Sequence, residues 1–338
     1  MIPSFQIMRG ICIISVVLTH IILKKSETIE YDIWIQNLIN IAVSGFVFLS
    51  GYFINIEKWK ADSYSYLKKR ITRLLIPYLL WSLFYICYNL LLGKDYSFLE
   101  IIKILALGKV AGPLYYLVVL LWLTLFTPFV LKKMDNKYWN VVFFLITPLS
   151  FLFLYYYQLN IGTIYFTGAL FPTSWFVFYY LGLKWQKLSL KISYKTIIAA
   201  LLLGYFLELI ETYFILNFSN DMQFATTPLR FFPLFYIIPF LFLFLKIKYN
   251  TIQYNTIQYN TIQLILKYLG DNSFGIYLCH IFFLGFVRAF VMKIINIENH
   301  YIIYVFTTLA LTLGVCSLII MVSKKVFPKK FLSMIGFS

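Results

Sequence analysis

Residues 8–20 of the chain place a cation, Arg9, and an imidazole, His20, in an otherwise apolar stretch. They are eleven residues apart, very nearly three turns of an α-helix, so both side chains would share one helix face. The rise between them is roughly 16 Å at 1.5 Å per residue. Ionisable groups inside a membrane helix are costly and indicate function by default. The alternative is that Arg9 extends to the membrane interface and His20 only bonds a neighbouring helix.

Two further arginines, Arg70 and Arg73, lie three residues apart in a basic cluster just before Pro77 and Tyr78. At that spacing they would share one helix face, and paired guanidinium groups suit bidentate contacts with phosphate. The alternative is that the cluster only anchors the chain at the cytoplasmic side of a membrane.

Two carboxylates, Glu208 and Glu211, also lie three residues apart within an apolar stretch. A carboxylate at the depth of His20 could orient the imidazole and raise its basicity, or bind sugar hydroxyls. Equally, the two glutamates could pair with Arg230 or Arg288, which are expected at a similar depth.

Tyr277 and His280 would share one face of a late apolar segment, with His280 near its middle. The alternative for His280 is a buried histidine that a neighbouring group satisfies. Ser50 and Gly51 end the second apolar stretch, where small residues permit close helix packing.

The composition is that of an integral membrane protein. Of the 338 residues, 61% are hydrophobic and only 12% are charged, against about 25% charged in soluble proteins, and the mean hydropathy is +0.81. We therefore expect an all-α, polytopic membrane protein that forms one domain over residues 1–338, with kinks or broken turns at Pro172, Pro233 and Pro239. A spanning helix needs about 20 apolar residues, and about ten transmembrane helices are predicted, at 5–23, 33–54, 74–92, 113–131, 138–157, 167–184, 195–216, 228–246, 272–292 and 301–323.

The distribution of lysine and arginine predicts the orientation of these segments. Alternate connections, at 55–73, 132–137, 184–195, 246–271 and 324–330, hold 20 basic residues, whereas the opposite connections hold 6. The basic set would face the cytoplasm, so both termini are expected inside. The net charge of +16 then indicates contact with lipid headgroups and not with nucleic acid.

Two connections have a recognisable character. Residues 93–111 are predicted to hold a short amphipathic helix on the outer surface. Residues 249–263 repeat Tyr-Asn-Thr-Ile-Gln three times and are predicted to form a low-complexity cytoplasmic loop. The four cysteines all fall in apolar runs, and no spacing indicates a metal site or a disulfide framework.

Four motifs in this order make the chain resemble the acyltransferase 3 family of membrane-bound acyltransferases, in its short, membrane-only form. They are an Arg followed after ten residues by a His, a Phe-rich Ser-Gly-Tyr ending, an Arg-x-x-Arg before Pro-Tyr, and a late Ser-x-x-Ile-Tyr-Leu-x-His. Their residues here are Arg9 and His20; Phe46 to Phe53; Arg70, Arg73, Pro77 and Tyr78; and Ser273, Ile276, Tyr277, Leu278 and His280. The likeness covers almost the whole chain, although Leu114-Tyr115-Tyr116-Leu117 stands where the family often has Leu-Trp-Phe-Leu.

The resemblance implies transfer of an acyl group, usually acetyl, from cytoplasmic acyl-CoA to a hydroxyl of a surface polysaccharide or lipid-linked glycan. The protein would be a multi-pass protein of the bacterial cytoplasmic membrane, with acetyl-CoA as co-substrate and no metal. His20 would be the general base or a transient acyl carrier. Arg70 and Arg73, with Arg9, would hold the CoA phosphates. Glu208 or Glu211 would orient His20, and Tyr277, His280 or Ser50 would donate to the oxyanion.

A transporter or flippase of a glycan intermediate is the main alternative, because intramembrane charges and proline-interrupted helices also fit that class. A transporter would more often show an internal two-fold repeat in hydropathy, and this sequence shows none. A third reading, a degenerate member that acts as a sensor, is disfavoured by the intact His20.

Overall fold

A computed structural model of the protein describes residues 3–22, 29–162, 165–187, 192–219, 221–254 and 260–337. Within these ranges every regular element is a helix. In chain order the elements are α1 (Pro3–Ile21), α2 (Ile29–Ile39), α3 (Ile41–Tyr52), α4 (Ile56–Ala61), α5 (Ser63–Leu91), α6 (Phe98–Leu107), η2 (Gly112–Leu114), α7 (Tyr115–Lys133), α8 (Lys137–Asn160), α9 (Tyr165–Leu170), α10 (Pro172–Lys184), η3 (Trp185–Lys187), α11 (Tyr194–Ser219), α12 (Met222–Ala225), α13 (Pro233–Tyr254), α14 (Thr261–Asp271), α15 (Ser273–Ile294), α16 (Ile297–Val326) and α17 (Lys329–Ile335).

The all-α membrane class is confirmed. Among the described residues, eight spans are long and apolar enough to cross a membrane, judged by length and composition. They are Pro3–Ile21, Glu30–Tyr52, Ser63–Leu91, Gly112–Lys133, Lys137–Asn160, Tyr194–Ser219, Ser273–Ile294 and Ile297–Val326.

The other two predicted segments, 167–184 and 228–246, form shorter helices. The first is divided into α9 and α10, and the apolar part of α13 is Pro233–Ile247. Pro172 and Pro233 begin α10 and α13, positions where a missing N–H costs nothing, so the predicted segments are broken at these two prolines and not kinked within a continuous helix. Pro239 lies inside α13. Every residue of α10 from Ser174 to Leu183 is buried, so this helix lies within the bundle.

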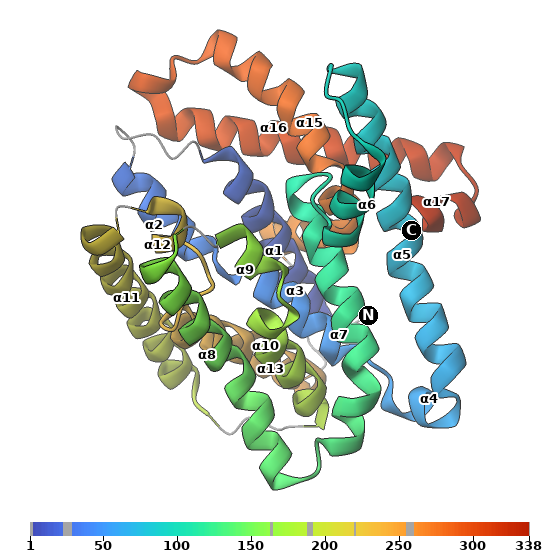
Figure 1. The fold of residues 1–338 in the computed structure, drawn as a ribbon, viewed down its shortest axis with the longest axis vertical. Coiled ribbons are helices and arrows are strands. Elements are labelled where there is room, and N and C mark those ends of the chain that lie inside the picture. Colours follow the sequence, from blue (N-terminus) through green and yellow to red (C-terminus); the bar gives the residue numbers. More distant parts are fainter. Residues whose placement is uncertain are drawn as a thin grey trace.

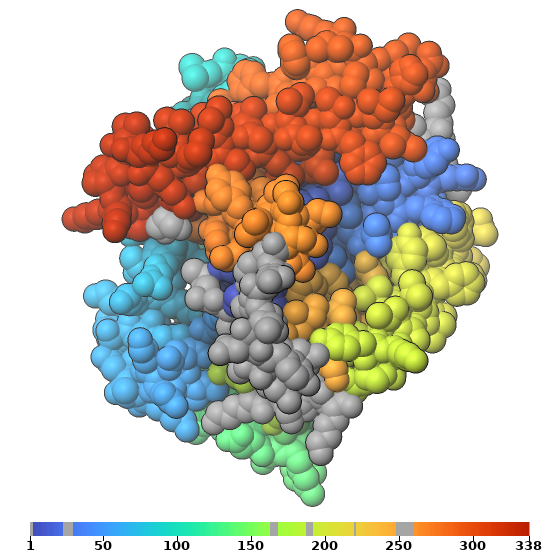
Figure 2. Space-filling view, turned by 180° about the vertical axis from the view of Figure 1, so that it is seen from behind, coloured from blue at the N-terminus to red at the C-terminus, as the bar shows by residue number. Residues whose placement is uncertain are grey.

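Helix α1 occupies the middle of the bundle (Figure 1). It packs against α3, α13, α14, α15 and α16, and most of its residues are buried. From behind, α16 forms a red band across the molecule (Figure 2). The helix that carries Arg9 and His20 is therefore surrounded by other helices along its length.

Of the two connections described from the sequence, the structure confirms the helix predicted within 93–111 but not the loop predicted at 249–263. Helix α6 confirms the short helix within 93–111: a capping box of Ser97 and Glu100 begins it, and Gly108, at φ +67°, ends it. In the predicted loop 249–263, by contrast, residues 249–254 continue α13 and 261–263 begin α14. Residues 255–259 lie outside the described residues.

Glycines set the closest helix crossings. A Cβ added to Gly10 would lie 2.0 Å from the carbonyl oxygen of Leu266 in α14. Similarly, a Cβ on Gly182 of α10 would lie 2.2 Å from the carbonyl oxygen of Phe48 in α3. Close backbone approach at small residues is a common way for helices to associate in membranes.

Gly182→Ala is therefore expected to lower the unfolding temperature of the purified protein, because overpacking against backbone atoms typically costs about 1–3 kcal/mol. Gly285→Ala is the matched control, since no atom lies within 4 Å of its added Cβ and alanine favours a helix. Thermal unfolding followed by size-exclusion chromatography in detergent measures both variants. Equal unfolding temperatures would contradict the close crossing of α3 and α10.

Candidate active site

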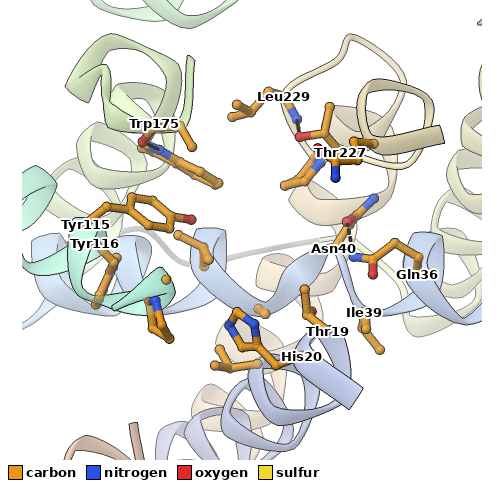
Figure 3. A pocket seen from close by; sticks show the side chains of 18 of the residues that line it. Thr19, His20, Gln36, Ile39, Asn40, Tyr115, Tyr116, Trp175, Thr227 and Leu229 are labelled. Carbon is orange, nitrogen blue, oxygen red and sulfur yellow. Dashed lines mark hydrogen bonds between the residues drawn. The ribbon is translucent and has the colours of Figure 1, made fainter. Parts of the chain in front are cut away.

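A cavity of about 360 Å³ lies beside the C-terminal end of α1. It is lined by residues of α1, of α2 and α3, of η2 and α7, of α10, of the connection between α12 and α13, and of α15. His20 and Thr19 form one wall; Trp175 and Tyr115 face Asn40 and Thr227 across the space (Figure 3). The side chain that the sequence singled out as a base thus borders a cavity large enough for a small molecule.

His20 is held by its backbone as well as by packing. The guanidinium of Arg288 on α15 donates to the carbonyl oxygens of His20, at 2.5 Å, and Ile21, at 3.2 Å. These are carbonyls of the last turn of α1, which have no partner within the helix. Arg288 thereby caps α1 and fixes its end at the cavity.

His280 lies next to His20, with their ring centroids 5.5 Å apart. Its Nδ1 is 2.8 Å from the carbonyl oxygen of Tyr277 and 3.2 Å from that of Ile276, so Nδ1 carries the proton and donates. Its Nε2 is then an acceptor, and among the described residues it has no hydrogen-bond partner. His280 is fully buried and offers a lone pair, not an N–H, on the side away from its own helix backbone.

Helix α2 ends and α3 begins at Asn40, within one predicted segment. The Asn40 side chain points away from the helix axis and donates to Glu208 Oε1 at 2.6 Å and to the carbonyl oxygen of Thr226 at 3.2 Å. Interrupted helices at membrane depth are tolerated where they are buried in protein or line a cavity. Asn40 does both, since it is 3% exposed and lines the cavity.

Behind this wall, Arg230 is surrounded by two carboxylates. Its guanidinium lies 3.1 Å from Glu211 and 3.6 Å from Glu208, and all three side chains are buried. Glu211 also accepts from Tyr155. Arg230 donates in addition to Asn37 on α2, at 2.8 Å. Of the roles considered for the two glutamates, the structure thus supports the ion pair with Arg230, and Glu208 is linked to the cavity through Asn40.

Arg9 and Arg70 come together at the other end of α3. Arg9 donates to Gln6 at 3.2 Å, and its guanidinium carbon lies 5.0 Å from the ring centre of Phe53. Arg70, from α5, donates to the hydroxyl of Ser50 at 2.8 Å and to its carbonyl oxygen at 2.5 Å. Both arginines therefore contact the Phe-rich Ser-Gly ending of the second segment, Arg70 through Ser50 and Arg9 through Phe53.

Tyr116 connects this end of α3 with the cavity. Its buried side chain lines the cavity and lies within electrostatic range of the guanidinium groups of both Arg9 and Arg70. Arg73 differs from these arginines because its side chain is exposed on the surface of α5.

The three side chains considered as oxyanion donors are engaged elsewhere. Ser50 lies outside the cavity lining, where its hydroxyl accepts from Arg70, and the hydroxyl of Tyr277 donates to the carbonyl oxygen of Pro113. His280 donates to its own helix. None of the three therefore directs a hydrogen-bond donor into the cavity in this arrangement.

The sequence did not identify three residues that shape the site, Asn40, Gln36 and Trp175, and it considered Arg288 only as a partner of the glutamates, whereas Arg288 donates to the end of α1. A weak signal was available for two of them, since Gln36 and Asn40 are amides four residues apart in an apolar segment and would share a helix face. In the part of the chain that the structure describes, no group of three or more His, Cys, Asp or Glu side chains could hold a metal ion.

Comparison with known families gives one match. The family described as the acyltransferase domain of acyltransferase 3 matches residues 2–321 of the 338. Searches of curated proteins and of solved structures gave no significant match.

Glu211→Ala is expected to destabilise the protein by about 3 kcal/mol or more, because it breaks a buried ion pair and leaves the guanidinium of Arg230 and the hydroxyl of Tyr155 without their acceptor. Glu57→Ala, which removes an exposed carboxylate from α4, should change stability by about 0.5 kcal/mol or less. Thermal unfolding of both variants in detergent tests the difference. A Glu211 variant as stable as the Glu57 variant would contradict the structural role of the ion pair.

Proposed function

The chain belongs to the acyltransferase 3 family and is a membrane acyltransferase, and from this premise we propose its donor, its acceptor and its catalytic base. The donor is acyl-CoA, in the first instance acetyl-CoA, on the cytoplasmic side. The acceptor is a hydroxyl of a cell-surface polysaccharide or lipid-linked glycan on the outer side. The observation that carries the proposal is the position of His20, at a cavity wall, on the same continuous helix as Arg9.

His20 acts as the general base. Its imidazole removes the proton of the acceptor hydroxyl as that oxygen attacks the thioester carbonyl carbon. The tetrahedral intermediate then collapses, the C–S bond breaks, and the CoA sulfur takes the proton from His20. The products are the glycan ester and free CoA thiol. A route in which His20 carries the acyl group would use the same imidazole as nucleophile.

His280 is a positioning residue for this base. The rings of the two histidines are 5.5 Å apart, and the buried Nε2 of His280 has a free lone pair among the described residues. An N–H of His20 directed toward that lone pair would leave the other ring nitrogen of His20 as the proton acceptor. Tyr277 supports the arrangement by holding the carbonyl of Pro113 at the cavity wall.

The donor would enter at the end of α3. Arg9, Arg70 and Arg73 supply positive charge there, which suits the phosphates of CoA. The thin pantetheine arm would pass Tyr116 to bring the thioester to His20. Glu208 and Glu211 form ion pairs with Arg230, so in this proposal they do not act directly on the base.

The excess of basic residues in alternate connections supports an orientation with both termini in the cytoplasm. The surface charge would then contact anionic lipid headgroups. The Ile-, Asn-, Lys- and Tyr-rich composition supports a bacterial source, hence the bacterial cytoplasmic membrane. In this orientation Arg9 faces the cytoplasmic half of the membrane and His20 the outer half, as transfer across the membrane requires.

His20→Ala is expected to abolish acyl transfer while the protein remains folded, since general-base catalysis alone typically contributes about 10²–10⁴-fold. The measurement is mass spectrometry of surface polysaccharide from cells with the intact gene, a deletion, and the deletion complemented with His20→Ala. An ester-linked acyl mass should occur only with the intact gene, and unmodified glycan should reach the surface in all three.

The control is His300→Ala, which removes a histidine of α16 outside the cavity lining. Wild-type ester content in the His20 variant would contradict the catalytic role. Loss of the glycan itself from the surface of the deletion strain would favour the transporter.

Arg73→Ala is expected to raise the KM for acetyl-CoA about tenfold without changing unfolding temperature, because Arg73 is exposed and a charge-assisted bond to phosphate is worth about 1.5–3 kcal/mol. Arg70→Ala should raise the same KM and also lower the unfolding temperature, because it removes two hydrogen bonds to Ser50. Lys103→Ala, on α6, is the control for lost surface charge. An unchanged KM for acetyl-CoA in the double Arg70→Ala and Arg73→Ala variant would show that both residues only anchor the chain at the membrane surface.

A further inference from the structure

The cavity has one wall of amides whose orientation is fixed by the buried cluster behind it. The carbonyl of Thr226 can only accept, so the group of Asn40 that faces it is the Nδ2 donor. Asn40 Oδ1 is therefore the acceptor on the other side, where Gln36 Nε2 donates to it at 3.5 Å. This leaves Gln36 Oε1 at the end of the series, as a buried acceptor.

Gln36 Oε1 has no hydrogen-bond donor among the described residues, although Gln36 is only 5% exposed. A buried acceptor left unpaired is costly, so a ligand that brings a donor to it would gain affinity. Gln36 and Asn40 both line the cavity that His20 borders. The wall is thus an unfilled hydrogen-bonding site next to the proposed base.

Opposite the amides stands an aromatic wall. Trp175 is fixed in place because its Nε1 donates to the carbonyl of Ala169 at 2.9 Å, and Tyr115 lies beside it (Figure 3). A flat aromatic face and a few polar groups at a fixed position are the usual elements of a small-molecule site. The two walls would suit a ring with an apolar face and hydroxyls at its edge.

The described lining contains no Asp, Glu, Lys or Arg side chain. Arg230 is paired with Glu208 and Glu211 behind Asn40, and none of these three side chains lines the cavity. A phosphate or a carboxylate would find no cation to pair with in this cavity, whereas a neutral hydroxyl needs only an acceptor such as an amide oxygen. This argues against the nucleotide part of CoA as the occupant and in favour of the acceptor.

We propose that Gln36 and Asn40, facing Trp175, form the acceptor subsite, and that it takes an uncharged sugar ring whose hydroxyl donates to Gln36 Oε1. The inference rests on the proposed function, because it assigns the acceptor of that reaction. A second hydroxyl of the same ring would lie toward His20, which borders the same cavity. Gln36 is thus a residue of acceptor binding, and the Arg230 cluster positions it through Asn40.

The test compares wild type with Gln36→Met, which keeps the length of the side chain and removes the amide. Both proteins are purified in octaethylene glycol dodecyl ether, because a detergent with a sugar headgroup would compete for the subsite. The probe acceptor is unmodified surface polysaccharide from the deletion strain, with acetyl-CoA as donor. Gln158→Met, which removes a buried amide of α8 outside this cavity lining, is the matched control.

We expect Gln36→Met to raise the KM for polysaccharide about 5- to 10-fold, the factor that corresponds to one neutral hydrogen bond. Its KM for acetyl-CoA and its unfolding temperature should equal those of wild type. Gln158→Met should leave both KM values unchanged, although it removes a hydrogen bond to Asp221. An unchanged KM for polysaccharide in a folded Gln36→Met protein would overturn the subsite. An equal rise in both KM values would also overturn it, since it would indicate a general distortion.

The activity of the wild-type protein shows whether a failure concerns the subsite alone or also the proposed function. If wild type forms no ester on the polysaccharide from acetyl-CoA, the proposed function fails, and the subsite with it. If wild type forms the ester and Gln36→Met has the same KM for polysaccharide, only the subsite fails.

Discussion

An arginine buried in an apolar bundle is tolerated only if opposite charges and hydrogen bonds surround it, and Arg230 meets that condition through partners on three separate elements. Two carboxylates come from α11, an amide oxygen comes from α2, and the carbonyl of Thr227 accepts from its Nε at 2.8 Å. Because loss of a partner would leave a buried N–H of Arg230 without its acceptor, the cluster fixes α2, α11 and the connection that precedes α13 relative to one another. Asn40 is held in the cavity wall by its hydrogen bond to Glu208 of this cluster.

The segment formed by α2 and α3 connects the cavity wall at Asn40 with the arginines near Ser50 and Phe53. At its break, Asn40 is bound to Glu208 and lines the cavity. At its far end, Ser50 accepts from Arg70 and Phe53 lies under Arg9. One wall of the cavity and one cluster of positive charge therefore belong to the same short stretch of chain. Under the proposed function, this segment would set the distance between the acceptor at one end and the phosphates of the donor at the other.

The sequence predicted what depends on local periodicity and composition, and it failed where a distant partner decides. Arg9 and His20 share a face because α1 is one continuous helix, and a fixed period relates their positions. The spacing of the glutamates predicted a shared face but could not choose between His20 and Arg230 as partner. No proline or glycine near Asn40 marks the end of α2 in the sequence. The partner of Asn40 is Glu208, which lies 168 residues away in the chain. Pro172 was expected to kink or break a helix, and it breaks the predicted segment by beginning α10.

Of the 29 basic residues, only Arg9, Arg230 and Arg288 lie outside the connections between the ten predicted segments. Each is stabilised differently: Arg9 by an amide and an aromatic face, Arg230 by carboxylates, and Arg288 by carbonyls at the end of α1. None of the three lines the cavity, so charge surrounds that space without entering it. This matters for a base, because a carboxylate beside an imidazole favours its protonated form, which cannot accept a proton. The pairing of both glutamates with Arg230 keeps carboxylates out of the cavity that His20 borders, as the proposed role of His20 as a base requires.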